Sequence, residues 1–177
     1  MDPEVYILRH GETVWNVEGR MQGRQDSPLT PLGRVQAARQ GAILRRHGVS
    51  GLPCLASPLG RASLTARLAG LSATPDARLA EICMGQWEGQ LRRDLTDAPG
   101  LVWKFDAPGG EGLRAVQDRL RGVLAVLTGP AILVTHGVLS IALRAQLRGI
   151  GHEDWDALTD PQGVVHHVVG GQEKLLR

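Results

Sequence analysis

The sequence predicts an α/β fold built on a mostly parallel sheet. Two runs of apolar, β-favouring residues, 5–8 and 131–134, are each followed by a polar residue and then by His-Gly. Segments with apolar residues at helical spacing lie between the expected strands. This alternation is typical of parallel βαβ units. Because 177 residues suffice for one well-buried core, we expect a single domain over residues 1–177.

The first half of the chain gives clear signals for both element types. After the strand at 5–8, residues 12–29 form a long Gly-punctuated loop, a kind of segment that is often functional. A helix begins after Thr30, a good N-cap, with Pro31 at its first position, and ends at Gly48. The next expected elements are a short buried strand within 51–57, a helix over 59–71 and a short edge strand at 76–79.

The second half repeats the pattern after a polar stretch. A short helix is expected near 91–96, and an apolar stripe at helical spacing predicts a longer one over 111–127. The strand at 131–135 is continuously apolar, so we place it at the centre of the parallel sheet. A helix over 138–147 and strands at 164–169 and 173–176 complete the prediction.

Composition excludes several classes of function. The net charge is only +2, and the basic residues are scattered with few aromatics, so we expect no nucleic-acid partner. No apolar run approaches the roughly 20 residues that span a bilayer, and no leader pattern starts the chain, so we expect a cytoplasmic protein without membrane contact. Cys54 and Cys83 lie in apolar surroundings, and His166 and His167 point to opposite faces of a strand. We therefore expect no metal site.

The candidate chemistry begins at the end of the first strand. In an open α/β sheet, ligands bind outside the carboxyl ends of the strands, where Arg9, His10 and later His136 are expected. A neutral imidazole is a competent nucleophile, and an Arg fork matches phosphate or carboxylate oxygens. Taken alone, Arg9-His10 fits a solvated strand end equally well.

Other polar residues follow neighbouring elements. Arg61 is expected in the first turn of a helix. Because a helix N-terminus favours anions, a cation there suggests a bound anion nearby, although a surface Arg at this position costs little and is a fair alternative. Glu81 follows the expected edge strand and could lie partly desolvated, as a general acid requires, whereas on its own it fits an exposed Glu in a loop better. Asn16 and Gln22 could donate amide hydrogen bonds to phosphate oxygens, although turn chemistry explains them equally well.

The ordered motifs resemble the histidine phosphatase superfamily, which has the phosphoglycerate-mutase-like fold. They span residues 5–137, and the ordered series is specific where any single block is weak. The matching blocks are Arg9-His10-Gly11-Glu12-Thr13 with Trp15-Asn16, Gly19-Arg20-Met21-Gln22-Gly23, Asp26-Ser27-Pro28-Leu29-Thr30, Ser57-Pro58-Leu59-Gly60-Arg61-Ala62 with Thr65-Ala66, Leu79-Ala80-Glu81 with Gly85-Gln86-Trp87-Glu88-Gly89, Pro108-Gly109-Gly110-Glu111 and Val134-Thr135-His136-Gly137.

The resemblance implies a three-layer sandwich with helices on both faces of the sheet, and a catalytic role for certain residues. His10 would be the phosphorylated nucleophile, Arg9, Arg61 and His136 would surround the phosphoryl oxygens, and Glu81 would serve as acid and base. The arginines would supply the positive charge without a metal or other cofactor. Five further residues are implied as phosphate or substrate contacts: Asn16, Gln22, Gly23, Thr135 and Gly137.

Two departures bear on the activity. Gly112 replaces a Ser found in many relatives, and the segment at about 86–108, which covers the pocket in relatives, is short. Glu81 is followed by Ile82-Cys83-Met84-Gly85, whereas mutases of the superfamily have Arg-His-Tyr-Gly, and Arg92-Arg93 is only an echo of their Arg pair. Hydrolysis of phosphomonoesters is therefore preferred over cofactor-dependent phosphoglycerate mutation.

The sequence leaves the leaving group open. The phosphatases that the chain most resembles are α-ribazole phosphatases and broad-specificity phosphatases. α-Ribazole phosphate, phosphosugars, phosphoglycerate and phosphoserine all fit, so the expected partner is a small phosphorylated metabolite. A noncatalytic module that binds phosphorylated ligands is the least favoured alternative, since His10 and Glu81 are both present. Monomer and homodimer both remain open.

Overall fold

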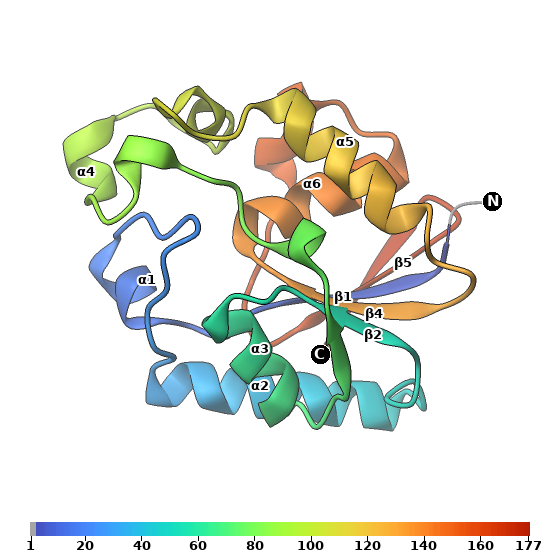
Figure 1. Cartoon of the computed structure of the whole chain (residues 1–177). Helices are drawn as coiled ribbons and strands as arrows, with labels where there is room; N and C mark the ends of the chain where they lie inside the picture. Colours follow the sequence, from blue (N-terminus) through green and yellow to red (C-terminus); the bar gives the residue numbers. More distant parts are fainter. Residues whose placement is uncertain (1–2) are drawn as a thin grey trace.

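A six-stranded sheet organises the protein, whose computed structural model describes residues 3–177 (Figure 1). Four strands run parallel, and two at one side pair antiparallel. The prediction of a mostly parallel sheet is therefore confirmed. In spatial order the strands are β3 (Ala73–Pro75), β2 (Cys54–Ala56), β4 (Ala131–Thr135), β1 (Val5–Arg9), β5 (Val165–Val169) and β6 (Gln172–Leu176).

Helices cover both faces of the sheet, as expected for a three-layer sandwich (Figure 1). One face carries α2 (Pro31–Arg46) and α3 (Gly60–Leu68), and the other carries α5 (Leu113–Leu124) and α6 (Gly137–Arg148). Successive side chains of a strand point to opposite faces, so each strand feeds both cores. Tyr6 and Leu8 of β1 join the core beneath α2 and α3, whereas Val5 and Ile7 join the core beneath α5 and α6.

Short elements surround one end of the sandwich. Residues 12–29, expected as a loop, contain the one-turn helix α1 (Val14–Glu18), which Thr13 caps through its side-chain oxygen. The segment expected to cover the pocket contains α4 (Arg92–Leu95) and the 3₁₀ helix η3 (Val102–Asp106). Phe105 of η3 packs edge-on against Trp155 of η4 (His152–Ala157), with ring centroids 5.9 Å apart. The cover is thus anchored to the C-terminal part of the chain.

The prediction of an edge strand at 76–79 is wrong. The strand β3 ends at Pro75, and residues 77–79 form the 3₁₀ helix η1 (Ala77–Leu79). Asp76 causes the change, because its carboxylate accepts the Arg78 backbone N–H at 2.9 Å and also binds the Arg78 side chain. Such a local side-chain bond competes with strand pairing for the backbone.

The other predicted helices and strands agree with the structure except for one strand. The strand predicted within 51–57 is shorter, Cys54–Ala56, while the other helices and strands begin and end within a few residues of their predicted limits. Within the described residues, no helix is both long and apolar enough to cross a membrane.

Two helix glycines predict opposite responses to the same substitution. A Cβ on Gly41 of α2 would lie 2.1 Å from the carbonyl oxygen of Ala69, at the C-terminus of α3, whereas a Cβ on Gly122 of α5 would meet only the Arg78 side chain at 3.6 Å. Gly41→Ala should lower the free energy of unfolding by about 1–3 kcal/mol through overpacking. Gly122→Ala should raise it by about 0.5–1 kcal/mol through helix propensity. Urea unfolding of both variants tests this, and equal shifts would contradict the close approach of α2 and α3.

Candidate active site

A cavity of about 390 Å³ opens at the carboxyl ends of the parallel strands. Strands β1 and β4 pair in a register that places Arg9 beside Thr135, so the residues that follow them, His10 and His136, also become neighbours. Their ring centroids lie 5.1 Å apart. Eight of the predicted site residues line the cavity: Arg9, His10, Asn16, Gln22, Gly23, Arg61, Glu81 and Gly137.

His10 is held as a neutral imidazole with one nitrogen free to react. Its side chain is almost fully buried, and Nδ1 lies 2.8 Å from the Gly11 carbonyl oxygen, which can only accept a hydrogen bond. Nδ1 therefore carries the hydrogen and Nε2 the lone pair, toward which Arg61 Nε donates at 3.3 Å. Burial, reinforced by the charges of Arg61 and Arg9, holds the pKa of His10 well below 6.5. The ring stays unprotonated near neutral pH.

Arg61 is buried, with 2% of its surface exposed, and the loop before α2 wraps around it. Its guanidinium donates to the carbonyl oxygens of Gly23 at 2.8 Å and Gln25 at 2.6 Å. The Asp26 carboxylate accepts from Nη1 at 2.9 Å and also from the Arg61 backbone N–H. A carboxylate of the chain itself, Asp26, therefore accompanies Arg61 at this helix N-terminus, and the bound anion suggested by the sequence stays a prediction.

Arg9 enters the cavity from the end of β1. It donates from Nη1 to the Asp160 carbonyl oxygen at 2.8 Å, and the Asp160 carboxylate lies 3.7 Å away. Asp160 is itself fixed by the Ser140 hydroxyl at 2.8 Å and by Arg144. Gly137 permits the close approach, since a Cβ there would lie 3.3 Å from Arg9 Cζ.

Glu81 lies against the N-terminus of α6. Its carboxylate accepts the backbone N–H groups of Ile82 at 3.0 Å, Val138 at 3.1 Å and Leu139 at 3.2 Å. The positive end of the helix dipole favours a carboxylate here. Although η1 replaces the expected edge strand before it, Glu81 still reaches the cavity wall.

The two other residues predicted from the second His-Gly strand are placed differently. Neither His136 nor Thr135 is among the described residues that line the cavity. His136 lies fully buried behind the wall, with Nε2 2.7 Å from Ser57 Oγ. The Thr135 hydroxyl donates to the Leu79 carbonyl oxygen at 2.8 Å, so this side chain joins β4 to η1. The structure does not bring the Thr135 side chain to the phosphate pocket.

The three residues predicted from the long loop, Asn16, Gln22 and Gly23, all line the cavity. Asn16 lines the cavity, with its Oδ1 accepting from Gln162 at 3.2 Å. Gln22 donates to the Thr13 hydroxyl at 2.8 Å, next to the helix cap. Gly23 has φ +52°, and a Cβ there would lie 2.3 Å from a carboxylate oxygen of Glu88, so both its conformation and its packing require glycine.

A family model described as histidine phosphatase superfamily (branch 1) matches residues 5–175. The chain belongs to this superfamily. A relative from Salmonella paratyphi B named probable phosphoglycerate mutase GpmB is 35% identical over 165 residues, covering 83% of this chain and 75% of that protein.

Solved structures agree over nearly the whole chain. The protein Rv3214 of Mycobacterium tuberculosis has a TM-score of 0.84 at 28% identity, covering 99% of this chain and 96% of that one. The protein TTHB049 of Thermus thermophilus has a TM-score of 0.78 at 34% identity and covers 98% of both chains. A phosphoglycerate mutase of the same organism has a TM-score of 0.76 at 36% identity, covering 98% and 97%. The superfamily fold is therefore shown.

The mouth of this histidine phosphatase cavity carries three basic residues beyond the predicted site residues. Arg20 and Arg92 line it together with Lys104, one of the cover residues, and both Arg92 and Lys104 lie over the Trp103 ring. Burial is the main cause that lowers the pKa of Lys104. The charges of Arg9 and Arg92 lower this pKa further, whereas the nearby Glu81 raises it.

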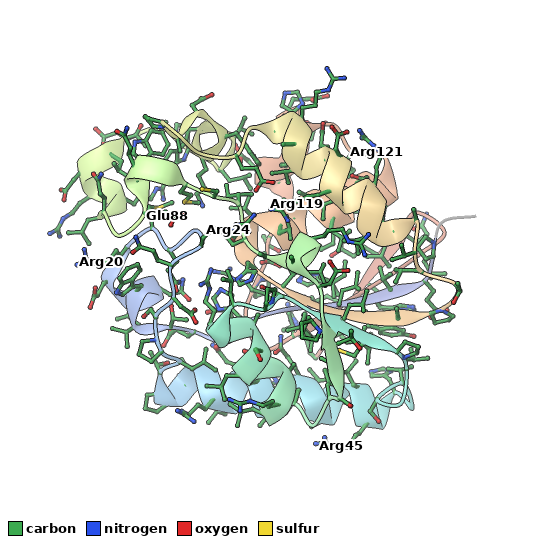
Figure 2. All side chains as sticks on the ribbon, viewed as in Figure 1. Arg20, Arg24, Arg45, Glu88, Arg119 and Arg121 are labelled. Carbon is green, nitrogen blue, oxygen red and sulfur yellow. The ribbon has the colours of Figure 1, made fainter. Side chains whose placement is uncertain are left out.

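The mouth is tied together by bonds between two distant loops. Figure 2 shows Arg20, Arg24 and Glu88 where the first loop meets the segment that precedes α4. The Glu88 carboxylate accepts the backbone N–H of Arg24 and of Met84, each at 2.9 Å, and Arg20 donates to the Gly89 carbonyl oxygen. Gly19-Arg20 and Glu88-Gly89 stand in the blocks quoted above, but nothing in the sequence indicated that they pair.

The buried histidines predict how stability depends on pH. Burial lowers the pKa of both His10 and His136 well below 6.5, so below pH 6.5 the unfolded chain binds protons that the folded chain does not. The free energy of unfolding should therefore rise with pH up to ~6.5, by up to about 1.4 kcal/mol per pH unit for each residue. His166 acts in the opposite direction: burial disfavours its charged form, but bonds to Asp160 and Glu173 outweigh burial and raise its pKa. Its contribution is full below pH ~6.5 and is lost as pH rises through the folded pKa.

Urea unfolding between about pH 5 and 9 measures both effects. A variant with His10→Gln and His136→Gln should lose most of the slope below pH 6.5, while His166→Gln should flatten the decline above it. An unchanged acid slope in the double variant would show that these two rings are not held neutral by the fold.

Proposed function

We propose that this chain is a metal-independent phosphomonoester hydrolase that works through a phosphohistidine at His10. The observation that supports it best is the state of His10: a buried neutral ring whose Nε2 lone pair faces Arg61 in a cavity that Arg9 also lines. An unprotonated nucleophile beside two fixed cations is the arrangement that phosphoryl transfer requires. Membership of the superfamily supports the same chemistry.

In the first step, His10 Nε2 forms a bond to phosphorus while the bond to the leaving oxygen breaks in line. Arg9 and Arg61 stabilise the charge that spreads over the phosphoryl oxygens. His136, whose ring centroid lies 5.1 Å from that of His10 in the buried layer next to the cavity, would donate a hydrogen bond to one of these oxygens. Glu81 delivers a proton to the leaving oxygen. The product alcohol then departs, leaving phosphohistidine and the Glu81 carboxylate.

In the second step, water replaces the alcohol. The Glu81 carboxylate takes a proton from the water as its oxygen attacks phosphorus, and the bond to His10 breaks. Inorganic phosphate leaves, and both residues return to their starting states. Asn16, Gln22, Gly23 and Gly137 complete the pocket that holds the phosphoryl group, whereas the Thr135 hydroxyl donates to the Leu79 carbonyl oxygen and so supports the wall through η1.

We further propose that the chain forms one catalytic domain over residues 1–177 and that residues 86–108 select the leaving group. Arg92 and Lys104 come from this segment and line the cavity, and both lie over the Trp103 ring of the same segment. Contacts to the phosphoryl group are common to all substrates, so discrimination falls to such residues.

Cofactor-dependent phosphoglycerate mutation is the second candidate. Relatives named probable phosphoglycerate mutase favour it, and the cations of the mouth could hold the second anionic group of a bisphosphorylated intermediate. The discriminating assay is the interconversion of 3- and 2-phosphoglycerate in the presence and absence of 2,3-bisphosphoglycerate. The mutase would be favoured if the bisphosphate stimulates the interconversion and if its rate exceeds the rate of phosphate release from every ester tested.

Loss of the nucleophile should abolish both turnover and the covalent intermediate. His10→Ala should lower phosphate release from a panel of phosphomonoesters in EDTA by roughly 10³-fold or more and remove acid-labile ³²P labelling. His47→Ala removes an exposed imidazole at the end of α2 and is the matched control. The hydrolase proposal would be falsified if the wild-type protein released no phosphate from the panel without added metal.

Loss of the acid should separate the two steps. Glu81→Gln should slow hydrolysis of poor leaving groups by about 10²–10⁴-fold. With p-nitrophenyl phosphate, whose leaving group needs little protonation, phosphoenzyme should accumulate because water is no longer activated. Rapid-quench ³²P labelling measures this, and Glu153→Gln, at an exposed site, is the control. Equal slowing for good and poor leaving groups, with no accumulation, would remove Glu81 from the acid role.

A further inference from the structure

The His136 ring is neutral, so only one of its nitrogens carries a hydrogen. Burial, together with the charges of Arg61 and Arg9 and the nearby His10, lowers its pKa well below 6.5. Nε2 lies 2.7 Å from Ser57 Oγ. Nδ1 is buried and has no partner among the described residues. Nδ1 is therefore the nitrogen left for a phosphoryl oxygen, and it can donate only if it bears the hydrogen.

Ser57 lies at the end of β2 and is almost fully buried. Its hydroxyl has one proton to donate and two lone pairs to accept with. The Leu59 backbone N–H already donates to Oγ at 3.2 Å. Within residues 3–177, the only other hydrogen-bond partner of this hydroxyl is His136 Nε2. Nε2 is therefore the atom that can accept the hydrogen bond donated by the Ser57 O–H.

We propose that Ser57 is a positioning residue: its hydroxyl donates to Nε2 of His136 and thereby fixes the tautomer that presents an Nδ1–H donor to the phosphoryl group. The inference rests on the proposed function, in which His136 contacts the phosphoryl oxygens. In the opposite tautomer Nδ1 would bring a lone pair against those oxygens, which repels rather than stabilises the developing charge. The tautomer matters here because burial, reinforced by the surrounding cations, disfavours the doubly protonated ring, which would donate from both nitrogens.

The direct test is ¹⁵N NMR of the wild-type protein labelled at histidine, at neutral pH without phosphate. The His136 signals are assigned by their absence in a His136→Gln variant. We expect a protonated Nδ1 and an unprotonated Nε2. A protonated Nε2, or a mixture of the two tautomers, overturns the proposal.

Variants at Ser57 add a functional readout. Ser57→Ala should convert His136 to a mixture of tautomers and lower kcat by about tenfold or more, with a smaller change in KM, because the bond lost acts mainly on developing charge. Ser57→Thr keeps a hydroxyl and should restore both the single tautomer and most of kcat. Ser63→Ala removes an exposed hydroxyl from α3 and should change neither. A wild-type tautomer and kcat in Ser57→Ala would overturn the proposal.

Failure of this inference can be told from failure of the proposed function. If the wild-type protein never forms ³²P-labelled enzyme, the hydrolase mechanism fails whatever the NMR result. If labelling occurs but His136 carries its hydrogen on Nε2, the mechanism stands and the assignment to Ser57 fails.

Discussion

The burial of the Arg61 guanidinium is the constraint on which the site depends. A buried charge without partners costs several kcal/mol, so the chain must satisfy its N–H groups before any substrate binds. Carbonyl oxygens of Gly23 and Gln25 and the Asp26 carboxylate do so. The first loop therefore takes its shape from Arg61. Because these partners are fixed within the fold, the cation is already in place when a phosphoryl group arrives, which is what electrostatic preorganisation means.

The same arrangement sets the state of the nucleophile. Arg61 and Arg9 cannot be moved away from His10 without leaving their own partners, so their charges act on the ring permanently. This costs stability at acid pH but keeps the lone pair available. The Glu81 carboxylate is held in a similar way, because backbone N–H groups at the N-terminus of α6 donate hydrogen bonds to it.

Much of this site could be predicted from the sequence because local signals were consistent with the fold. The two apolar strands that end at Arg9-His10 and just before His136 predicted that these residues lie together at the carboxyl ends of parallel strands. The register of β1 with β4 confirmed this placement. The edge strand at 76–79 failed because the Asp76 side chain captures the backbone of Arg78, an effect that strand periodicity does not register. Asp160 and Ser57 were missed because each acts across a long separation in sequence, and a single polar residue gives no periodic signal.

The choice between hydrolysis and mutation depends on the part of the site that sequence patterns describe least. The residues proposed to contact the phosphoryl group come from β1, α3, the N-terminus of α6 and the first loop, and such contacts are indifferent to the rest of the substrate. The cover instead places Arg92 and Lys104 on one indole, 5.8 and 5.9 Å from the Trp103 centroid. A mutase must hold a second anionic group and exclude water while its intermediate reorients. The two cations could meet the first requirement, but the cover is short, so exclusion of water is the physical condition that separates the two activities in this chain.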